Sequence, residues 1–322
     1  MKRFRKDIWE EGEYIYPAAY GFLPNIQAYL HDDDEKRDCI LILPGGGYCM
    51  CCSHEGELPA REFYKRGCNT FVLSYTTDIT MSVPLKRQPL EDISRAVRYI
   101  RKRADEYGVK RLFICGFSAA GHLCATLAVH FADVEDKNPQ YKDVSNRPDG
   151  AILSYPVITA GVFTHADSVR ALLGDDPSAE ELAYYSAEKN VGKDTPPCFI
   201  WQTQTDSVVP VENSYMFAEA LRKEGIPFAH YVYPSGEHGL SVSTKEMLSG
   251  TAEPLENYSM EQTEKAVEAV RKGRGINVSE KRRQELIDQF SAPPMEFPKP
   301  DMTLADDVGT WTDLACVWMK RI

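Results

Sequence analysis

The stretch FICGFSAAGHLCATLAVHF, residues 113–131, decides how the rest of the chain is interpreted. It begins as an apolar, strand-like run, passes through Gly116 and Ser118, and continues as an apolar helix pattern over 119–131. Small residues surround the serine, as a strained turn between a strand and a helix requires, because such a turn crowds the backbone. Two interpretations of Ser118 follow. It caps the helix, or it is a nucleophile held on the turn.

Apolar runs and helical patterns alternate along most of the chain. We expect strands at 39–43, 70–75, 111–115, 150–155, 198–203 and 228–233, and helices at 88–107, 119–131, 211–225 and near 305–321. Apolar strands separated by helices are typical of a mostly parallel sheet covered on both faces. The predicted fold class is therefore α/β, with a doubly wound sheet flanked by helices. Functional residues in such sheets gather at the carboxyl ends of the strands.

Residues 250–300 interrupt this alternation. The segment is polar and rich in charge, its pattern predicts two helices split by Gly273 to Gly275, and the proline-rich run APPMEFPKPD follows. We interpret the segment as an insertion in a single domain that covers 1–322. We expect it to act as a lid or as a contact between subunits of a homo-oligomer.

Composition excludes several classes of partner. The formal net charge of −11, from 48 acidic and 37 basic residues, disfavours nucleic acid, which attracts cationic surfaces. No stretch approaches the roughly 20 apolar residues of a membrane span. No apolar run follows the basic N-terminus, as a secretory signal would require. We therefore expect a cytoplasmic protein with no membrane partner.

The cysteines predict buried thiols rather than a metal site. There are nine, an odd number, and several fall in predicted strands or helices. Cys49, Cys51 and Cys52 are too closely spaced for a tetrahedral metal site, and no matching His/Cys pair occurs elsewhere. We expect no metal and no other cofactor.

A serine hydroxyl needs a general base, and the base needs a carboxylate that orients it. Asp206 and His238 each follow a predicted strand, so both belong at the same edge of the sheet as Ser118. Glu212 is the nearest rival for the carboxylate, but it opens a predicted helix, where an acidic residue favours the N-terminus. The sequence thus predicts the set Ser118, Asp206 and His238.

A glycine-rich loop follows the strand at 39–43, in LILPGGGY. Gly46 and Gly47 allow the backbone to approach closely and to turn its N–H groups inward, where they stabilise a developing oxyanion together with the N–H of Ala119. Phosphate binding is the alternative, but neither common phosphate-loop pattern is present. Because Tyr48 comes directly after this loop, we expect it, with the loop 49–57, to wall the substrate site.

At this point the chain resembles the α/β-hydrolases, in the branch of small esterases with a glycine-rich oxyanion loop, and in particular carbohydrate acetyl esterases or xylan esterase-like members. The matching stretches are LPGGGY, SHEGELPAREFYKRGCNTFVLSY, PLEDISRAVRYIR, ICGFSAAGHL, QTDSVVPVENS, GEHGLSVS and TWTDLACVWMKR. The resemblance covers the chain from about 39 to 245 and again from 308. It does not explain residues 250–300.

The resemblance implies a role for each site residue. Ser118 would be the nucleophile, His238 the base and Asp206 its partner. The oxyanion donors would be Gly46, Gly47 and Ala119. Two positions depart from the family pattern. Pro44 stands where many relatives have a histidine, so the bracing of the loop differs, and Ala120 replaces the second glycine of the serine motif.

The implied activity is that of a serine hydrolase. It would cleave short-chain acyl esters, chiefly acetyl, on small molecules, sugars or oligosaccharides, through an acyl-enzyme. An amide or peptide-bond hydrolase uses the same parts. A hydrolase fold that binds without turnover is an alternative from a different class, for which Pro44 and Ala120 are the support.

Overall fold

The computed structural model describes residues 1–322 apart from 274, 277 and 293–300. Its sheet has the strand order β1-β2-β4-β3-β5-β6-β7-β8. The strands are β1 (Lys2–Asp7), β2 (Asn25–Leu30), β3 (Arg37–Leu43), β4 (Asn69–Ser74), β5 (Val109–Phe117), β6 (Gly150–Ser154), β7 (Cys198–Thr203) and β8 (Phe228–Tyr233). β2 pairs antiparallel with both β1 and β4, and the pairs from β4 to β8 are parallel. The predicted fold class is confirmed.

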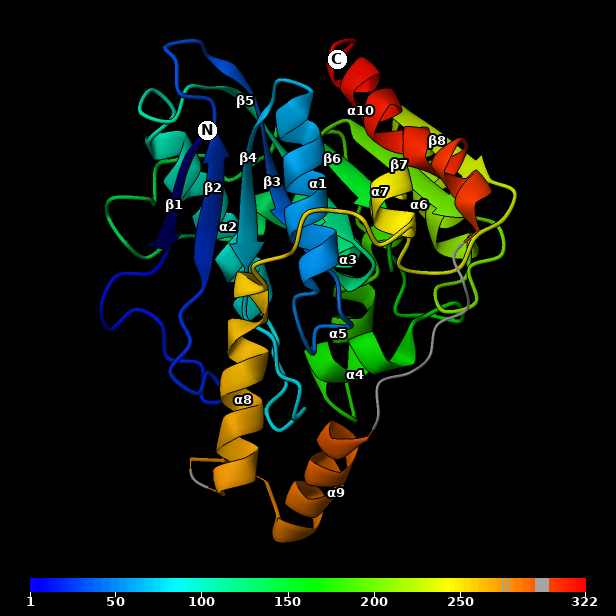
Figure 1. The fold of residues 1–322 in the computed structure, drawn as a ribbon. Helices are drawn as coiled ribbons and strands as arrows, with labels where there is room; N and C mark the ends of the chain where they lie inside the picture. Colours follow the sequence, from blue (N-terminus) through cyan, green and yellow to red (C-terminus); the bar gives the residue numbers. More distant parts are fainter. Residues whose placement is uncertain (274, 277, 293–300) are drawn as a thin grey trace.

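Helices cover both faces of the sheet (Figure 1). They are α1 (Ser53–Lys65), α2 (Gln88–Lys102), α3 (Ala119–His130), α4 (Ala166–Leu173), α5 (Ala179–Tyr184), α6 (Glu212–Glu224), α7 (Lys245–Leu248), α8 (Glu261–Lys272), α9 (Glu280–Ser291) and α10 (Trp311–Met319). The core of one face includes residues of α1 and α10, and that of the other includes residues of α2, α3 and α6. In the described part of the chain, no helix combines the length and apolar character needed to cross a bilayer.

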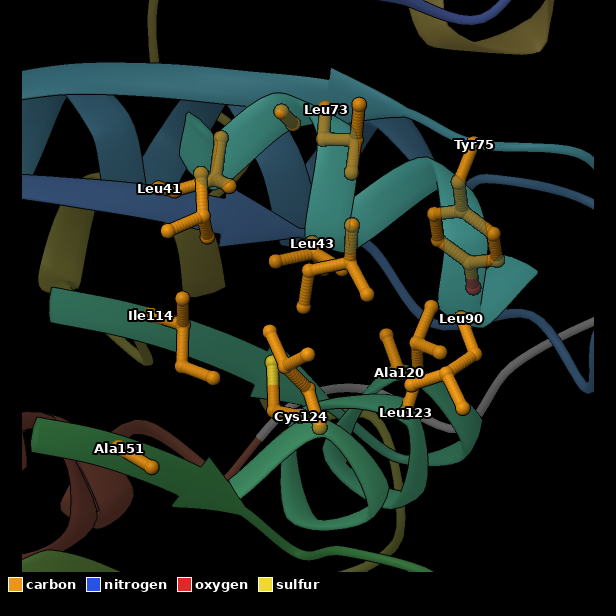
Figure 2. Packing of buried hydrophobic residues seen from close by; sticks show 14 of the residues in the cluster. Leu41, Leu43, Leu73, Tyr75, Leu90, Ile114, Ala120, Leu123, Cys124 and Ala151 are labelled. Atoms are coloured by element: carbon orange, nitrogen blue, oxygen red, sulfur yellow. The ribbon is translucent and has the colours of Figure 1, made fainter. Parts of the chain in front are cut away.

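The core under α3 sets the position of the serine turn. Figure 2 shows Leu43 of β3 on the side of the sheet where Ala120, Leu123 and Cys124 of α3 lie, and all four side chains belong to one buried cluster. Burial of one leucine side chain contributes about 2 kcal/mol to the free energy of folding. The Ala120 methyl group is fully buried in this cluster, which explains why alanine is tolerated where the family pattern has glycine.

Most predicted elements match the structure. The helix expected at 88–107 ends at Lys102, after which turns lead into β5. The last helix begins at Trp311 rather than 305, since 302–305 and 308–310 form 3₁₀ turns. The prediction missed β1 and β2. β1 is almost entirely exposed and charged and has no apolar pattern of its own.

The segment 250–300 contains the two predicted helices, α8 and α9. Its base is attached close to the carboxyl ends of β3 and β4. The Ser259 hydroxyl donates to the Cys51 carbonyl at 3.0 Å, and Gln262 accepts from the Thr77 N–H at 2.8 Å. From there α8 and α9 extend beyond the sheet (Figure 1). Most of the proline-rich run lies outside the described residues, and the role of the segment as a lid or subunit contact stays a prediction.

Candidate active site

Ser118 lies on a tight turn between β5 and α3. Its backbone has φ +53° and ψ −120°, a conformation that residues other than glycine rarely adopt. The turn has no room for larger neighbours: a Cβ on Gly116 would lie 2.2 Å from the Ala120 carbonyl oxygen, and one on Gly121 would lie 2.7 Å from Pro156. The serine side chain makes no capping hydrogen bond to the helix. Ser118 thus occupies the N-cap position of α3 but does not cap the helix through its side chain.

The structure brings Ser118, His238 and Asp206 into one hydrogen-bonded chain. His238 Nε2 lies 2.7 Å from Ser118 Oγ, and His238 Nδ1 lies 2.7 Å from Asp206 Oδ2. All three residues follow the carboxyl end of a strand, namely β5, β7 and β8. The histidine side chain is 15% exposed and the aspartate side chain is fully buried. Solvent therefore reaches His238 but not the Asp206 carboxylate.

The environment of Asp206 determines which nitrogen of His238 carries the proton. One carboxylate oxygen, Oδ1, accepts the N–H groups of Val208 and Val209 at 3.0 and 2.9 Å. The other, Oδ2, faces Nδ1, and because a carboxylate only accepts, Nδ1 must be the protonated nitrogen. Nε2 then carries a lone pair directed at the Ser118 hydroxyl, which is the arrangement of a general base.

The glycine loop lies against this serine. A Cβ on Gly45 would lie 3.0 Å from Ser118 Cβ and 2.6 Å from the Phe117 carbonyl oxygen, so only glycine fits. Gly46 and Gly47 have positive φ values of 129° and 65°. Within the described residues, the N–H groups of Gly46, Gly47 and Ala119 have no hydrogen-bond acceptor. These N–H groups are available to bind an oxyanion.

Tyr48 differs from its predicted role. Its side chain is 1% exposed, and its hydroxyl lies 2.8 Å from His122 Nδ1 on α3. The other ring nitrogen of His122 lies 2.7 Å from the Tyr185 carbonyl oxygen, so that nitrogen donates and Nδ1 accepts from the tyrosine. Tyr48 thus ties the glycine loop to the helix that follows Ser118, and its side chain does not wall the substrate site. From Ser53 on, the predicted wall loop 49–57 is the first turn of α1.

The burial of His122 predicts a pH dependence of stability. Burial lowers the pKa of His122 to about 4, while the Tyr185 carbonyl opposes and His130 adds to this shift. Below about pH 6.5 the unfolded chain gains a proton that the folded protein does not take up until about pH 4. The contribution of neutral His122 to the free energy of unfolding is therefore fully present above about pH 6.5. It is lost as the pH falls towards 4, and the loss amounts to at most about 3 kcal/mol.

Urea unfolding at intervals between pH 7.5 and 5 checks this expectation, because most carboxylates titrate below that range. His165 and His230 also have pKa values lowered by burial and contribute in the same direction. His122→Gln isolates one contribution, since glutamine can still accept from Tyr48 and donate to Tyr185. If the variant and the wild type lost the same stability as the pH was lowered, the assignment of this effect to His122 would be wrong.

Sequence reasoning missed Glu55. The residue is 3% exposed, and its carboxyl group accepts the Gly45 N–H at 2.9 Å and the Tyr155 hydroxyl at 2.6 Å. A glutamate in the first turn of a helix usually only complements the helix dipole, so its position gave no signal. Pro44 could have indicated such a residue. It stands where the resembled family has a histidine that holds the glycine loop, so another side chain must hold the loop here.

A metal centre has no ligand set in the described residues: no group of three or more His, Cys, Asp or Glu side chains is placed to hold an ion. Burial raises the pKa values of the Cys49 and Cys51 thiols to about 12. Both thiols are therefore protonated at neutral pH, a state in which they are poor metal ligands.

The strand order of the sheet and a serine on a strand–turn–helix make this protein an α/β-hydrolase. More particularly, the chain belongs to the BD-FAE family, whose model matches residues 26–221. It is thus a member of an esterase and hydrolase family. The resemblance inferred from the sequence is confirmed.

Relatives named for xylan chemistry are among the matches. The chain is 67% identical over 272 residues to "Endo-1,4-beta-xylanase B" of Butyrivibrio fibrisolvens, which covers 84% of this chain and 42% of that protein. It is 30% identical over 254 residues to "Acetylxylan esterase" of Xylanibacter ruminicola, covering 76% of this chain and 47% of that protein. The chain therefore spans less than half the length of these curated relatives.

A solved structure matches over nearly its whole length. It is the acetyl ester-xyloside bifunctional hydrolase from Caldicellulosiruptor lactoaceticus, with a TM-score of 0.70 and 34% sequence identity. The match covers 83% of this chain and 96% of that one. Fold and family thus agree between the two proteins.

Proposed function

We propose that this chain hydrolyses short-chain acyl esters, with acetyl groups on sugars or oligosaccharides as its substrates. The observation that carries the proposal is the continuous hydrogen-bond chain from Asp206 through His238 to Ser118, with both distances at 2.7 Å. In this proposal Ser118 is the nucleophile, His238 the general base and Asp206 the group that orients the base.

The proposed reaction has two halves. His238 Nε2 takes the hydroxyl proton as Ser118 Oγ attacks the ester carbonyl, and the negative charge forms next to the free N–H groups of Gly46, Gly47 and Ala119. The alcohol leaves with the proton from His238, and an acyl-serine remains. Water then attacks the acyl group with the same assistance, which releases the carboxylic acid and restores Ser118.

The substrate class is inferred from the relatives. One is named an acetylxylan esterase and another an acetyl ester-xyloside bifunctional hydrolase. We propose esterase rather than xylanase activity for this chain, because the hydrogen-bonded chain at Ser118 is that of a serine hydrolase, whereas most glycosidases use two carboxyl groups that face the scissile bond. Here Asp206 is engaged by His238, and Glu55 is engaged by Gly45 and Tyr155.

Hydrolysis of p-nitrophenyl acetate, butyrate and octanoate tests the proposal. We expect acetate to give the highest kcat/KM, and acetylated xylo-oligosaccharides to release acetate without cleavage of the sugar chain. p-Nitroacetanilide, an amide of the same acyl group, should react far more slowly. Faster hydrolysis of octanoate would overturn the short-acyl assignment. If the protein neither turned over any of these esters nor reacted with a fluorophosphonate, the result would favour a binding protein.

A further inference from the structure

Glu55 and Tyr155 join two loops that approach Ser118 from different parts of the chain. The Gly45 N–H donates to Glu55 Oε2 at 2.9 Å, which holds the start of the oxyanion loop. The Tyr155 hydroxyl donates to Glu55 Oε1 at 2.6 Å. The same hydroxyl oxygen accepts the Ser241 N–H at 3.0 Å, three residues after His238. One buried carboxyl group therefore connects the oxyanion loop with the histidine loop.

The direction of each hydrogen bond follows from the groups present. The phenol has one proton, and since its oxygen already accepts from Ser241, that proton is directed at Glu55. The Tyr155 ring also packs edge-on against the His238 ring, with centroids 4.9 Å apart. Tyr155 thus contacts the histidine loop twice, through its hydroxyl group and through its ring.

We propose that Glu55 is a positioning residue, which holds the oxyanion donors and the base in a common geometry and takes over the brace that Pro44 cannot provide. The inference rests on the proposed esterase function. Buried carboxyl groups are costly unless they are hydrogen-bonded, and here both oxygens accept from groups that belong to the site. Glu55 does not touch the reacting atoms. It acts through Gly45 and Tyr155.

Glu55→Gln tests the proposal with the smallest change in shape. Glutamine keeps one accepting oxygen but presents an amide N–H₂ to the other donor, so one of the two bonds is lost. We expect kcat for p-nitrophenyl acetate to fall by about 10- to 100-fold, since a misplacement of about 1 Å costs about 100-fold. KM should change by less than about threefold, because substrate contacts are kept.

Glu57→Gln is the matched control. Glu57 is on the same helix and fully buried, but it accepts the N–H groups of Glu256 and Asn257 at 2.9 and 2.8 Å, which are outside the catalytic loops. This variant should lose stability while its kcat stays within about twofold of the wild type. Tyr155→Phe keeps the ring and removes the hydroxyl. Combined with Glu55→Gln, it should cost less than the product of the two single effects, because both act in one chain.

Hydrogen exchange supplies a measurement that does not depend on turnover. Peptides that span residues 44–52 should exchange faster in Glu55→Gln and at the wild-type rate in Glu57→Gln. If the wild type hydrolyses no ester, the proposed function fails, and this comparison alone decides whether Glu55 holds the loop. Wild-type exchange of residues 44–52 in Glu55→Gln, or a kcat equal to that of Glu57→Gln, would overturn the proposal.

Discussion

Ser118→Ala is expected to lower kcat for p-nitrophenyl acetate by about 10⁵- to 10⁶-fold, which leaves only the catalysis that the oxyanion donors and binding provide. The variant lacks the atom that forms the acyl-enzyme, and no other hydroxyl takes its place in the hydrogen bond to His238 Nε2 among the described residues. Initial rates at high enzyme concentration, together with fluorophosphonate labelling followed by mass spectrometry, measure the effect.

The fold should survive this substitution. Alanine meets the same strain as serine at φ +53°, and Ser118 makes no capping bond that would be lost. The urea midpoint should therefore stay close to the wild-type value. Ser94→Ala is a control for a buried serine far from the site, where the hydroxyl accepts from Asn146. Residual activity above about 1% of wild type in Ser118→Ala, after contaminants are excluded, would show that another group is the nucleophile.

The position of the candidate site could be predicted because strand ends are readable from the sequence. Ser118, Asp206 and His238 each follow an apolar run that proved to be a strand, and parallel strands bring their carboxyl ends together. The hydrogen bonds between the three residues then depend on the turn after each strand. The small residues around Ser118 signalled that the turn at this serine is strained.

Residues whose roles depend on tertiary contacts could not be predicted. α1 was missed because it contains Gly56 and Pro59, which both disfavour a helix. Position 56 has no room for a larger residue, because a Cβ there would lie 2.9 Å from Val72 and 3.0 Å from Pro44. Because α1 was not recognised as a helix, the sequence also gave no indication that the Glu55 side chain points into the protein. Tyr48 was misjudged because adjacency in sequence does not tell which way a side chain points.

Asp206→Asn is the second substitution with a very large expected effect. The amide can satisfy the Val208 and Val209 N–H groups through its oxygen, as Asp206 Oδ1 does. Its N–H₂ group then faces His238 Nδ1, which must become an acceptor, so the proton moves to Nε2. In that tautomer His238 has no lone pair for the Ser118 proton. We expect kcat to fall by about 10⁴-fold with the geometry intact.

The comparison that isolates this effect is Asp92→Asn. Asp92 is also fully buried and accepts several donors, among them the Thr76 N–H at 2.8 Å and Trp9 Nε1 at 2.8 Å, but it is outside the site. Its replacement should affect stability and leave kcat nearly unchanged. If Asp206→Asn kept kcat within about tenfold of the wild type, the tautomer argument would be wrong, since a histidine protonated at Nε2 cannot accept the serine proton.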